Sequence, residues 1–278
     1  MSADPSGYDP HFLELPVALP GPTAARTLRL LTYTHFSVLL DPVRRLALAT
    51  GVNIDGDRLL DLERGDDWHL DARVLDSEQV GPELYARNDL DRGHLVRRRD
   101  PVWGDRATAQ RANDDTFVFT NAAPQAAKFN QGDTLWSGLE DHVLEYARAE
   151  RARISVFTAP VLDPSDPPYR GIRVPRRFWK VAAWVARFDG DPALRAAAFV
   201  LDQSPQLDAI DVRSTEADSP PPLGPFRTFQ VPVTDVAALT DLDLTTLSEA
   251  DVLAAAPRTA RPGSAWIPLQ NPGDILLG

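Results

Sequence analysis

The chain has 278 residues, of which 43% are hydrophobic and 25% charged, a composition typical of a soluble globular protein rather than a fibrous or disordered one. It contains no cysteine, which excludes disulfides, zinc–thiolate sites and thiol nucleophiles, so any metal needs nitrogen or oxygen ligands. No apolar run reaches the roughly eighteen residues of a membrane helix, and we expect no membrane partner.

The charges are distributed unevenly along the chain. The net charge of −11 argues against a generic nucleic-acid-binding protein, which usually carries a basic surplus. Between residues 148 and 187, however, nine lysines and arginines stand against three acids, whereas residues 188–278 carry thirteen acids and five arginines. Because a basic surface can exist on an acidic protein, the sequence is compatible with a local basic binding face.

Residues 1–30 are rich in proline and glycine and show no sustained periodicity, which predicts an extended N-terminal arm. The remaining length suits one domain, residues 31–278. Within this domain, apolar and β-branched runs predict strands, the first two joined as a hairpin by the turn at 41–45. The predicted strands cover residues 32–40, 46–54, 116–120, 154–158, 178–188 and 197–202.

Helical spacing of apolar residues runs from about residue 134 to residue 151, and a second helix is predicted near 247–255. Strands and helices do not alternate in the regular order of a parallel sheet. The predicted fold is therefore α+β, with a largely antiparallel central sheet and flanking helices.

The run Asp91-Arg92-Gly93-His94 carries groups suited to phosphodiester hydrolysis. That reaction needs a base to deprotonate water, a cation to neutralise developing charge, and donors for the remaining phosphate oxygens. The imidazole of His94 has an unperturbed pKa of about 6.5, which suits a general base near neutral pH. Arg92 can bind a phosphate through two hydrogen bonds.

Two segments rich in side-chain amides lie beyond this run. Asn121 and Gln125 belong to the stretch after residue 120, and Asn130 opens the tripeptide Asn-Gln-Gly. Amide oxygens can bind hard cations and amide nitrogens can donate to phosphate. Taken alone, Asn121 could also terminate a strand and Asn130 could be an ordinary turn residue.

In these segments and their order, the chain resembles the DNA/RNA non-specific endonucleases, the endonuclease G-like nucleases with a ββα-metal finger. The resemblance extends from about residue 32 to residue 251. The matching segments are Val52–Gly56, Asp91–His94, Asn113–Phe117, Thr120–Asn121, Pro124–Gln125, Asn130–Gly132, Trp136, Leu139–Glu140, Val156–Pro160, Val174–Pro175, Phe178–Lys180 and Phe229–Val233.

The resemblance implies a cofactor, Mg²⁺ with Mn²⁺ as the alternative, bound to the protein mainly through Asn130 and otherwise hydrated. It implies that His94 activates the attacking water and that Arg92 stabilises the phosphate in the transition state. Glu140 would orient a metal-bound water.

The resemblance also implies substrate contacts. Asn121 and Gln125 would line the substrate groove, and Arg64, ahead of Trp68, would match a further phosphate-binding arginine.

Two features depart from the family pattern. Arg97, Arg98 and Arg99 open an arginine-rich insertion directly after the expected base, which is either a second phosphate contact or a solvated surface. We include Arg97 and Arg98 among the candidate substrate-binding residues. Asp133 and Thr134 lengthen the stretch before Trp136. Two extra helical residues would rotate the rest of the helix by roughly 200°, so we expect a loop to absorb them.

The function predicted from these residues is a metal-dependent, sequence-nonspecific endonuclease that hydrolyses DNA and/or RNA and leaves 5′-phosphate ends. One alternative is an inactive nucleic-acid-binding or regulatory domain of the same fold. Another is a phosphoesterase that acts on small nucleotides.

DNA and/or RNA are the expected partners, and a homo-oligomer or a regulatory partner that restrains the activity stays open. Since the first residues show no basic start with an apolar stretch after it, we expect a cytoplasmic location.

Overall fold

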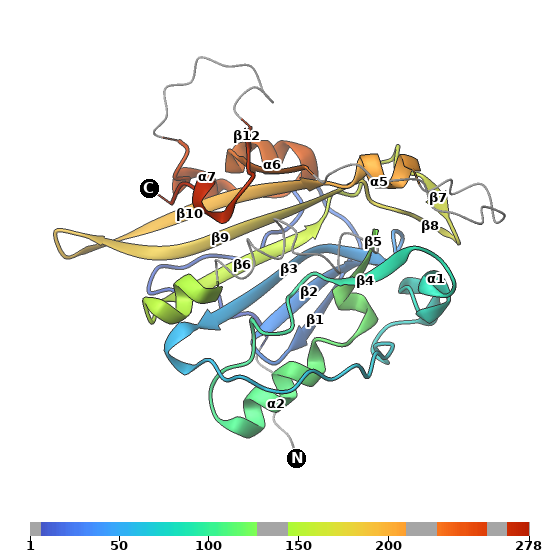
Figure 1. The fold of residues 1–278 in the computed structure, drawn as a ribbon, viewed down its shortest axis with the longest axis horizontal. Helices are drawn as coiled ribbons and strands as arrows, with labels where there is room; N and C mark the ends of the chain where they lie inside the picture. Colours follow the sequence, from blue (N-terminus) through green and yellow to red (C-terminus); the bar gives the residue numbers. More distant parts are fainter. Residues whose placement is uncertain (1–6, 127–143, 210–226, 255–265, 278) are drawn as a thin grey trace.

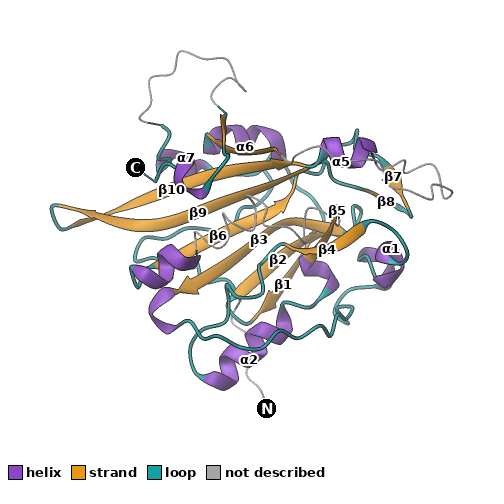
Figure 2. Ribbon diagram, viewed as in Figure 1, coloured by secondary structure: helices purple, strands orange, loops and turns teal. Residues whose placement is uncertain are grey.

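The computed structural model describes residues 7–126, 144–209, 227–254 and 266–277. Its centre is an eight-stranded sheet in the order β1-β2-β3-β6-β9-β10-β11-β12, in which every neighbouring pair is antiparallel (Figures 1 and 2). The strands are β1 Arg29–Tyr33, β2 Phe36–Asp41, β3 Leu46–Asp55, β6 Arg153–Pro160, β9 Arg177–Phe188, β10 Asp191–Asp202, β11 Arg227–Val231 and β12 Ile267–Pro268. This sheet confirms the predicted α+β class.

Both faces of the sheet are covered, which explains why all ten residues of β3 are buried. One face packs against residues of the N-terminal segment and against α6 (Val233–Thr240) and α7 (Thr245–Glu249). The other face packs against the layer that carries the shorter strands β4 (Leu90–His94) and β5 (Ala122–Ala126). Trp179 and Trp184 are buried on opposite faces, as expected for core residues.

The other described elements are short. They are η1 Gly56–Arg58, η2 Asp76–Glu78, α1 Pro82–Tyr85, α2 Arg106–Asp115, η3 Phe119–Asn121, β7 Pro168–Tyr169, β8 Ile172–Arg173, α5 Ser204–Ala209 and η4 Pro272–Asp274. Residues 144–149 are helical and belong to the predicted helix 134–151, the start of which lies outside the described residues. In the part of the chain that the structure describes, no helix is long and apolar enough to cross a membrane.

Three predictions of secondary structure were wrong in detail. The single strand at 32–40 is two strands, because His35 adopts a positive φ of 68° and turns the chain between β1 and β2. The strand at 116–120 is absent, since Thr116 caps α2 and η3 begins soon after it at Phe119. The helix at 247–255 is α7, which ends at Glu249.

The prediction also missed α2. Asp105 caps the start of this helix, because its carboxylate accepts hydrogen bonds from the backbone N–H groups of Ala107 and Thr108. It buries only Ala109, Ala112 and Asn113. With no large apolar side chain on its buried face, the helix gives no clear periodic signal in the sequence.

Candidate active site

The expected base and two of the expected amides lie on a two-stranded ribbon separate from the main sheet. Strands β4 and β5 pair antiparallel, so that His94 lies opposite Ala122 and Asp91 lies opposite Gln125. The backbone N–H of Leu95 extends the pairing by donating to the carbonyl of Asn121 over 2.9 Å. Segments almost thirty residues apart in the sequence are thus brought together, as the motif resemblance implied.

Gly93 is required by the close approach of the two strands. A Cβ atom at this position would overlap the side chain of Gln125, which lies directly over the Gly93 backbone. Gln125 is itself 3% exposed. The glycine of the Asp-Arg-Gly-His run therefore allows the Gln125 side chain to pack against β4 beside the base.

Asn121 is buried directly before β5 and bonded to the backbone. Its side chain is 0% exposed, accepts a hydrogen bond from the Val96 N–H over 2.8 Å, and donates to the carbonyls of Val96 and Thr116 over 3.0 Å each. The amide therefore holds together the backbone on both sides of the ribbon. This geometry shows that Asn121 positions the backbone, and the contact with substrate that the resemblance implied stays a prediction.

Gln203, at the end of β10, anchors the ribbon to the main sheet. Its amide accepts from the Ala126 N–H over 3.1 Å and donates to the Pro124 carbonyl over 3.3 Å. It also donates to the Pro175 carbonyl over 2.6 Å. Since Pro124 O and Ala126 N lie on the edge of β5 away from β4, the amide pairs with β5 as a third strand would.

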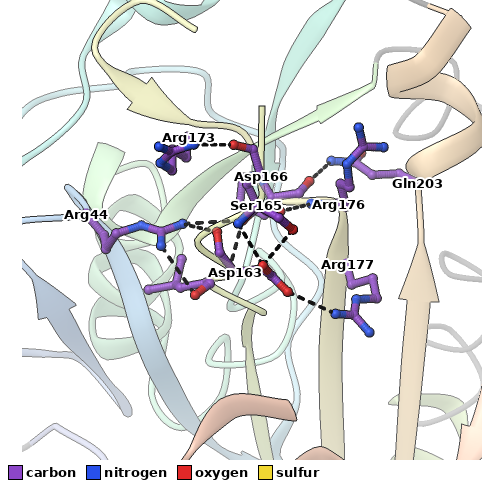
Figure 3. A network of polar contacts seen from close by, with 10 residues as sticks. Arg44, Asp163, Ser165, Asp166, Arg173, Arg176, Arg177 and Gln203 are labelled. Atoms are coloured by element: carbon purple, nitrogen blue, oxygen red, sulfur yellow. Dashed lines mark hydrogen bonds and ion pairs between the residues drawn. The ribbon is translucent and has the colours of Figure 1, made fainter. Parts of the chain in front are cut away.

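The segment that ends at Pro175 is fixed by a polar network (Figure 3). Asp166 is 1% exposed and accepts hydrogen bonds from Arg44 and from the backbone N–H groups of Asp163 and Arg176. Burial raises the pKa of Asp166 above its ordinary value. Arg176 in turn accepts from the backbone N–H of Gln203 over 2.9 Å. The network thus supports the residue that anchors the ribbon.

The imidazole of His94 lies among aromatic rings. The ring of Trp68 is 4.6 Å away between centroids, and Phe117 meets the imidazole edge to face at 5.2 Å. The backbone of His69 donates a hydrogen bond to the Phe117 carbonyl and accepts one from the Phe119 N–H, which keeps the adjacent Trp68 in place. The Nε2 atom of His94 is buried and has no hydrogen-bond partner among the described residues. A buried polar atom without a partner is unusual and marks this nitrogen as a candidate for chemistry.

The electrostatic environment keeps His94 neutral. Burial, together with the positive charges of Arg64, Arg98 and Arg92, lowers the pKa of His94 from 6.5 to about 3. Both causes act against the imidazolium form. At neutral pH the ring is therefore the unprotonated form that a general base requires.

The arginines near His94 are held in different ways. Arg92 lies with its guanidinium carbon 5.2 Å from the centre of the Trp68 ring and forms a 3.7 Å ion pair with Asp66. Arg98 donates to the carbonyl of Leu62 and to Oδ1 of Asn113, over 3.1 and 3.0 Å.

Arg64 and Arg97 are the other two arginines predicted to bind substrate. Arg64 is exposed, whereas Arg97 is half-buried at the start of the turn that contains Arg98. The positive charges of Arg64 and Arg97 both contribute to lowering the pKa of Arg98, which burial lowers most. Arg64, Arg92 and Arg98 therefore gather around the base, and the charge of Arg97 acts on Arg98.

Two predicted site residues, Asn130 and Glu140, lie outside the described residues. Within the described ranges no group of three or more histidines and carboxylates is arranged to hold a metal. The groups found beside His94 are cationic, so they suit a phosphate more than a metal. The resemblance implied Asn130 as the main metal ligand, and this stays a prediction.

The family profile of the DNA/RNA non-specific endonucleases matches residues 17–251. The chain belongs to this family. The assignment confirms the predicted family and, at the level of the family, the prediction of a nuclease-class hydrolase domain.

The chain is also similar to individual proteins, two of which are named nucleases. The uncharacterized protein y4fB of Sinorhizobium fredii is 41% identical over 83% of this chain and 37% of its own length. Human mitochondrial endonuclease G is 32% identical over 40% of this chain and 33% of its own length. Nuclease C1 of Cunninghamella echinulata is 28% identical over 74% of this chain and 80% of its own length. The chain thus spans about a third of the first two relatives.

A chain in the crystal structure of the EndoG/EndoGI complex has the same fold. It matches with a TM-score of 0.58 and 21% identity, covering 82% of this chain and 89% of that one. At this identity the likeness concerns the fold alone, and it agrees with the large antiparallel sheet described above.

Sequence reasoning missed three residues in and around the site: Trp68, Gln203 and Asp61, which pairs with both Arg99 and Arg148. Trp68 could have been suspected from its place after Arg64. Gln203 and Asp61 lie in no motif, and only the folded chain shows what they contact.

Proposed function

We propose that this domain is a metal-dependent endonuclease that hydrolyses phosphodiester bonds of DNA and/or RNA without sequence specificity and leaves 5′-phosphate ends. One observation carries the proposal: a neutral imidazole, surrounded by arginines, whose Nε2 has no partner in the described part of the chain, on a ribbon that belongs to a nuclease-family fold. A neutral base beside fixed positive charges is what attack of water on a phosphodiester needs.

In this proposal each side chain has a defined task. Nε2 of His94 takes the proton of the attacking water, and the low pKa of the ring keeps Nε2 unprotonated before the reaction across the neutral range. Arg92 and Arg98 neutralise charge that develops on the phosphate oxygens, and Arg64 and Arg97 bind the neighbouring backbone. Gln125 and Gly93 set the spacing of the ribbon.

The metal has a separate task. Asn130 would hold Mg²⁺ or Mn²⁺, with Glu140 orienting its water ligands, and the cation would stabilise charge on the scissile phosphate.

The proposal is tested with the purified chain, plasmid DNA and total RNA, each with Mg²⁺, with Mn²⁺ and with EDTA. We expect cleavage of at least one polymer that depends on metal and is lost in His94→Ala. Products should accept label from polynucleotide kinase only after phosphatase treatment, as 5′-phosphate ends require. Binding without cleavage under all conditions would favour the inactive binding domain. Cleavage of a dinucleotide alone would favour the small-nucleotide phosphoesterase.

A further inference from the structure

Two arginines, Arg99 and Arg148, converge on a single exposed carboxylate. Nη2 of Arg99 and Nη2 of Arg148 each lie 3.0 Å from Oδ1 of Asp61. Their hydrogen bonds, with Arg148 contributing most, hold the pKa of Asp61 below its ordinary value. The side chain of Asp61 is nevertheless 68% exposed, and those of the two arginines are 30% and 35% exposed. Two guanidinium groups that are open to solvent thus face one anionic oxygen.

The pair is continuous with the candidate active site. Arg99 comes directly after Arg98, which lowers the pKa of His94, and Arg98 donates to the carbonyl of Leu62, next to Asp61. The negative charge of Asp61 also acts on Arg98. Arg148 lies on the helical segment 144–149, which comes after the part of the chain that contains the expected metal ligand.

Asp61 differs from the neighbouring acids of the same segment. Asp55 and Asp57 each pair with one arginine, Arg153 at 3.8 Å and Arg151 at 3.5 Å. These two pairs lie on either side of Gly56, where a Cβ atom would overlap the backbone of the helical segment 144–149. They therefore belong to a region in which the two segments are closely packed. Asp61 lies beyond this packed region and is shared by two cations.

We propose that Arg99 and Arg148 form a binding subsite for a backbone phosphate that flanks the scissile phosphate, and that Asp61 occupies this subsite when no nucleic acid is bound. The inference rests on the nuclease function proposed above and adds a substrate contact to it. A phosphodiester carries one negative charge and two acceptor oxygens, so it can replace the carboxylate between the two guanidinium groups. Because exposed ion pairs contribute little stability, release of Asp61 has a low free-energy cost.

The kinetic test compares substrates of increasing length. The variants are Arg99→Gln and Arg148→Gln, and the substrates are single-stranded oligonucleotides of two to ten nucleotides, with Mg²⁺ supplied. For the wild type we expect kcat/KM to rise when a flanking phosphate reaches the subsite. The variants should cleave the dinucleotide at the wild-type rate and lose about ten-fold on the longest substrate. Equal losses on every length would overturn the subsite.

The binding test does not need turnover. In the His94→Ala background, each arginine variant should weaken binding to a 30-base-pair duplex and reduce the slope of log K against log salt by about 0.9, the value of one phosphate contact. The double variant should reduce the slope by the same amount, because both arginines bind one phosphate. Unchanged slopes would overturn the proposal. If the wild type cleaves nothing and these slopes still change, the function fails while the subsite stands.

Asp61→Asn tests the second half of the proposal. Removing the competing carboxylate should tighten duplex binding about three-fold, whereas weaker binding would show that Asp61 only supports the arginines and would overturn its role as an occupant. Arg187→Gln is the matched control, since Arg187 pairs with Glu14 at 2.7 Å with both side chains 56% exposed. It lies on the β9–β10 hairpin, far along the sheet from β4 in Figure 1, and should change neither slope nor rate.

Discussion

The indole of Trp68 lies against the imidazole of His94, with ring centroids 4.6 Å apart and ring planes inclined by 51°. The guanidinium of Arg92 lies near the same indole, 5.2 Å from its centre. One aromatic side chain therefore contacts both the proposed base and the proposed phosphate-binding arginine, and we regard it as a positioning residue.

Trp68→Ala is expected to lower kcat about ten-fold or more with a smaller change in KM, because the ring that fixes the orientation of the base is removed. Trp68→Phe should recover most of the rate. Steady-state kinetics on plasmid or oligonucleotide substrate provide the measurement. Trp266→Ala serves as the control, since Trp266 packs on Phe229 and donates to Asp235, against the core cluster that includes α6 and α7. Equal rates for Trp68→Ala and the wild type would remove Trp68 from the mechanism.

The acid limb of the pH profile should not show the ordinary titration of histidine. With the pKa of His94 lowered to about 3, the free enzyme holds a neutral base at every pH above about 4. We expect kcat/KM, which reports on the free enzyme, to show no inflection near pH 6.5. A clear inflection near pH 6.5 that arises from His94 would contradict the burial of the base.

The same shift makes stability depend on pH. Between pH 6.5 and about 3 the unfolded chain takes up a proton on His94 while the folded protein does not, so the folded state loses stability as pH falls through this window. His94→Gln removes this contribution. Thermal unfolding of both proteins from pH 8 to pH 4 should show the wild type losing more stability on acidification; parallel curves would mean that His94 is solvated.

The anchoring role of Gln203 can be separated from its contribution to stability. Gln203→Leu leaves Ala126 N–H and the carbonyls of Pro124 and Pro175 unpaired, which should lower the free energy of unfolding by about 3 kcal/mol and reduce activity strongly.

Gln230→Leu is the control, because Gln230 is also a buried amide that holds backbone. It donates one hydrogen bond to Leu276 and accepts one from it. The Gln230→Leu variant should lower stability without a matching loss of kcat in the folded protein. Equal kinetic effects of the two variants would argue against a role for Gln203 in placing the ribbon.

Gly93→Ala should destabilise the ribbon, because the added methyl group overlaps the side chain of Gln125. Overpacking of this kind costs about 1–3 kcal/mol. The double variant Gly93→Ala/Gln125→Ala should regain most of that stability in denaturant unfolding, since the overlapping atoms are gone. Failure of the second substitution to recover stability would show that the constraint at Gly93 lies elsewhere.

The sheet was predictable where the sequence pattern was strong. The runs that became β3 and β9 are long and apolar, since both faces of the sheet are covered. The β9–β10 turn at Asp189 and Gly190 was less visible, although both residues adopt the positive φ angles of a tight hairpin. Elements without large apolar residues, such as α2, gave no usable pattern.

For the site, the motif predicted which residues gather but not how each one acts. His94, Arg92 and Gln125 share the β4–β5 ribbon, as the resemblance implied. Asn121 belongs to the same motif and yet is enclosed by backbone, which no residue spacing reveals. The fixed position of Asp61 between two arginines depends on segments distant in sequence, so it could be seen only after folding.

The central claim is that His94 acts as a neutral general base for phosphodiester hydrolysis. Its most direct test is the single-turnover cleavage rate of a labelled duplex by wild type and His94→Ala, at saturating protein with Mg²⁺, alongside the duplex affinity of each protein. We predict that the variant binds the duplex within about two-fold of the wild type and cleaves it at least a hundred-fold more slowly. A His94→Ala protein that binds and cleaves like the wild type would contradict the account.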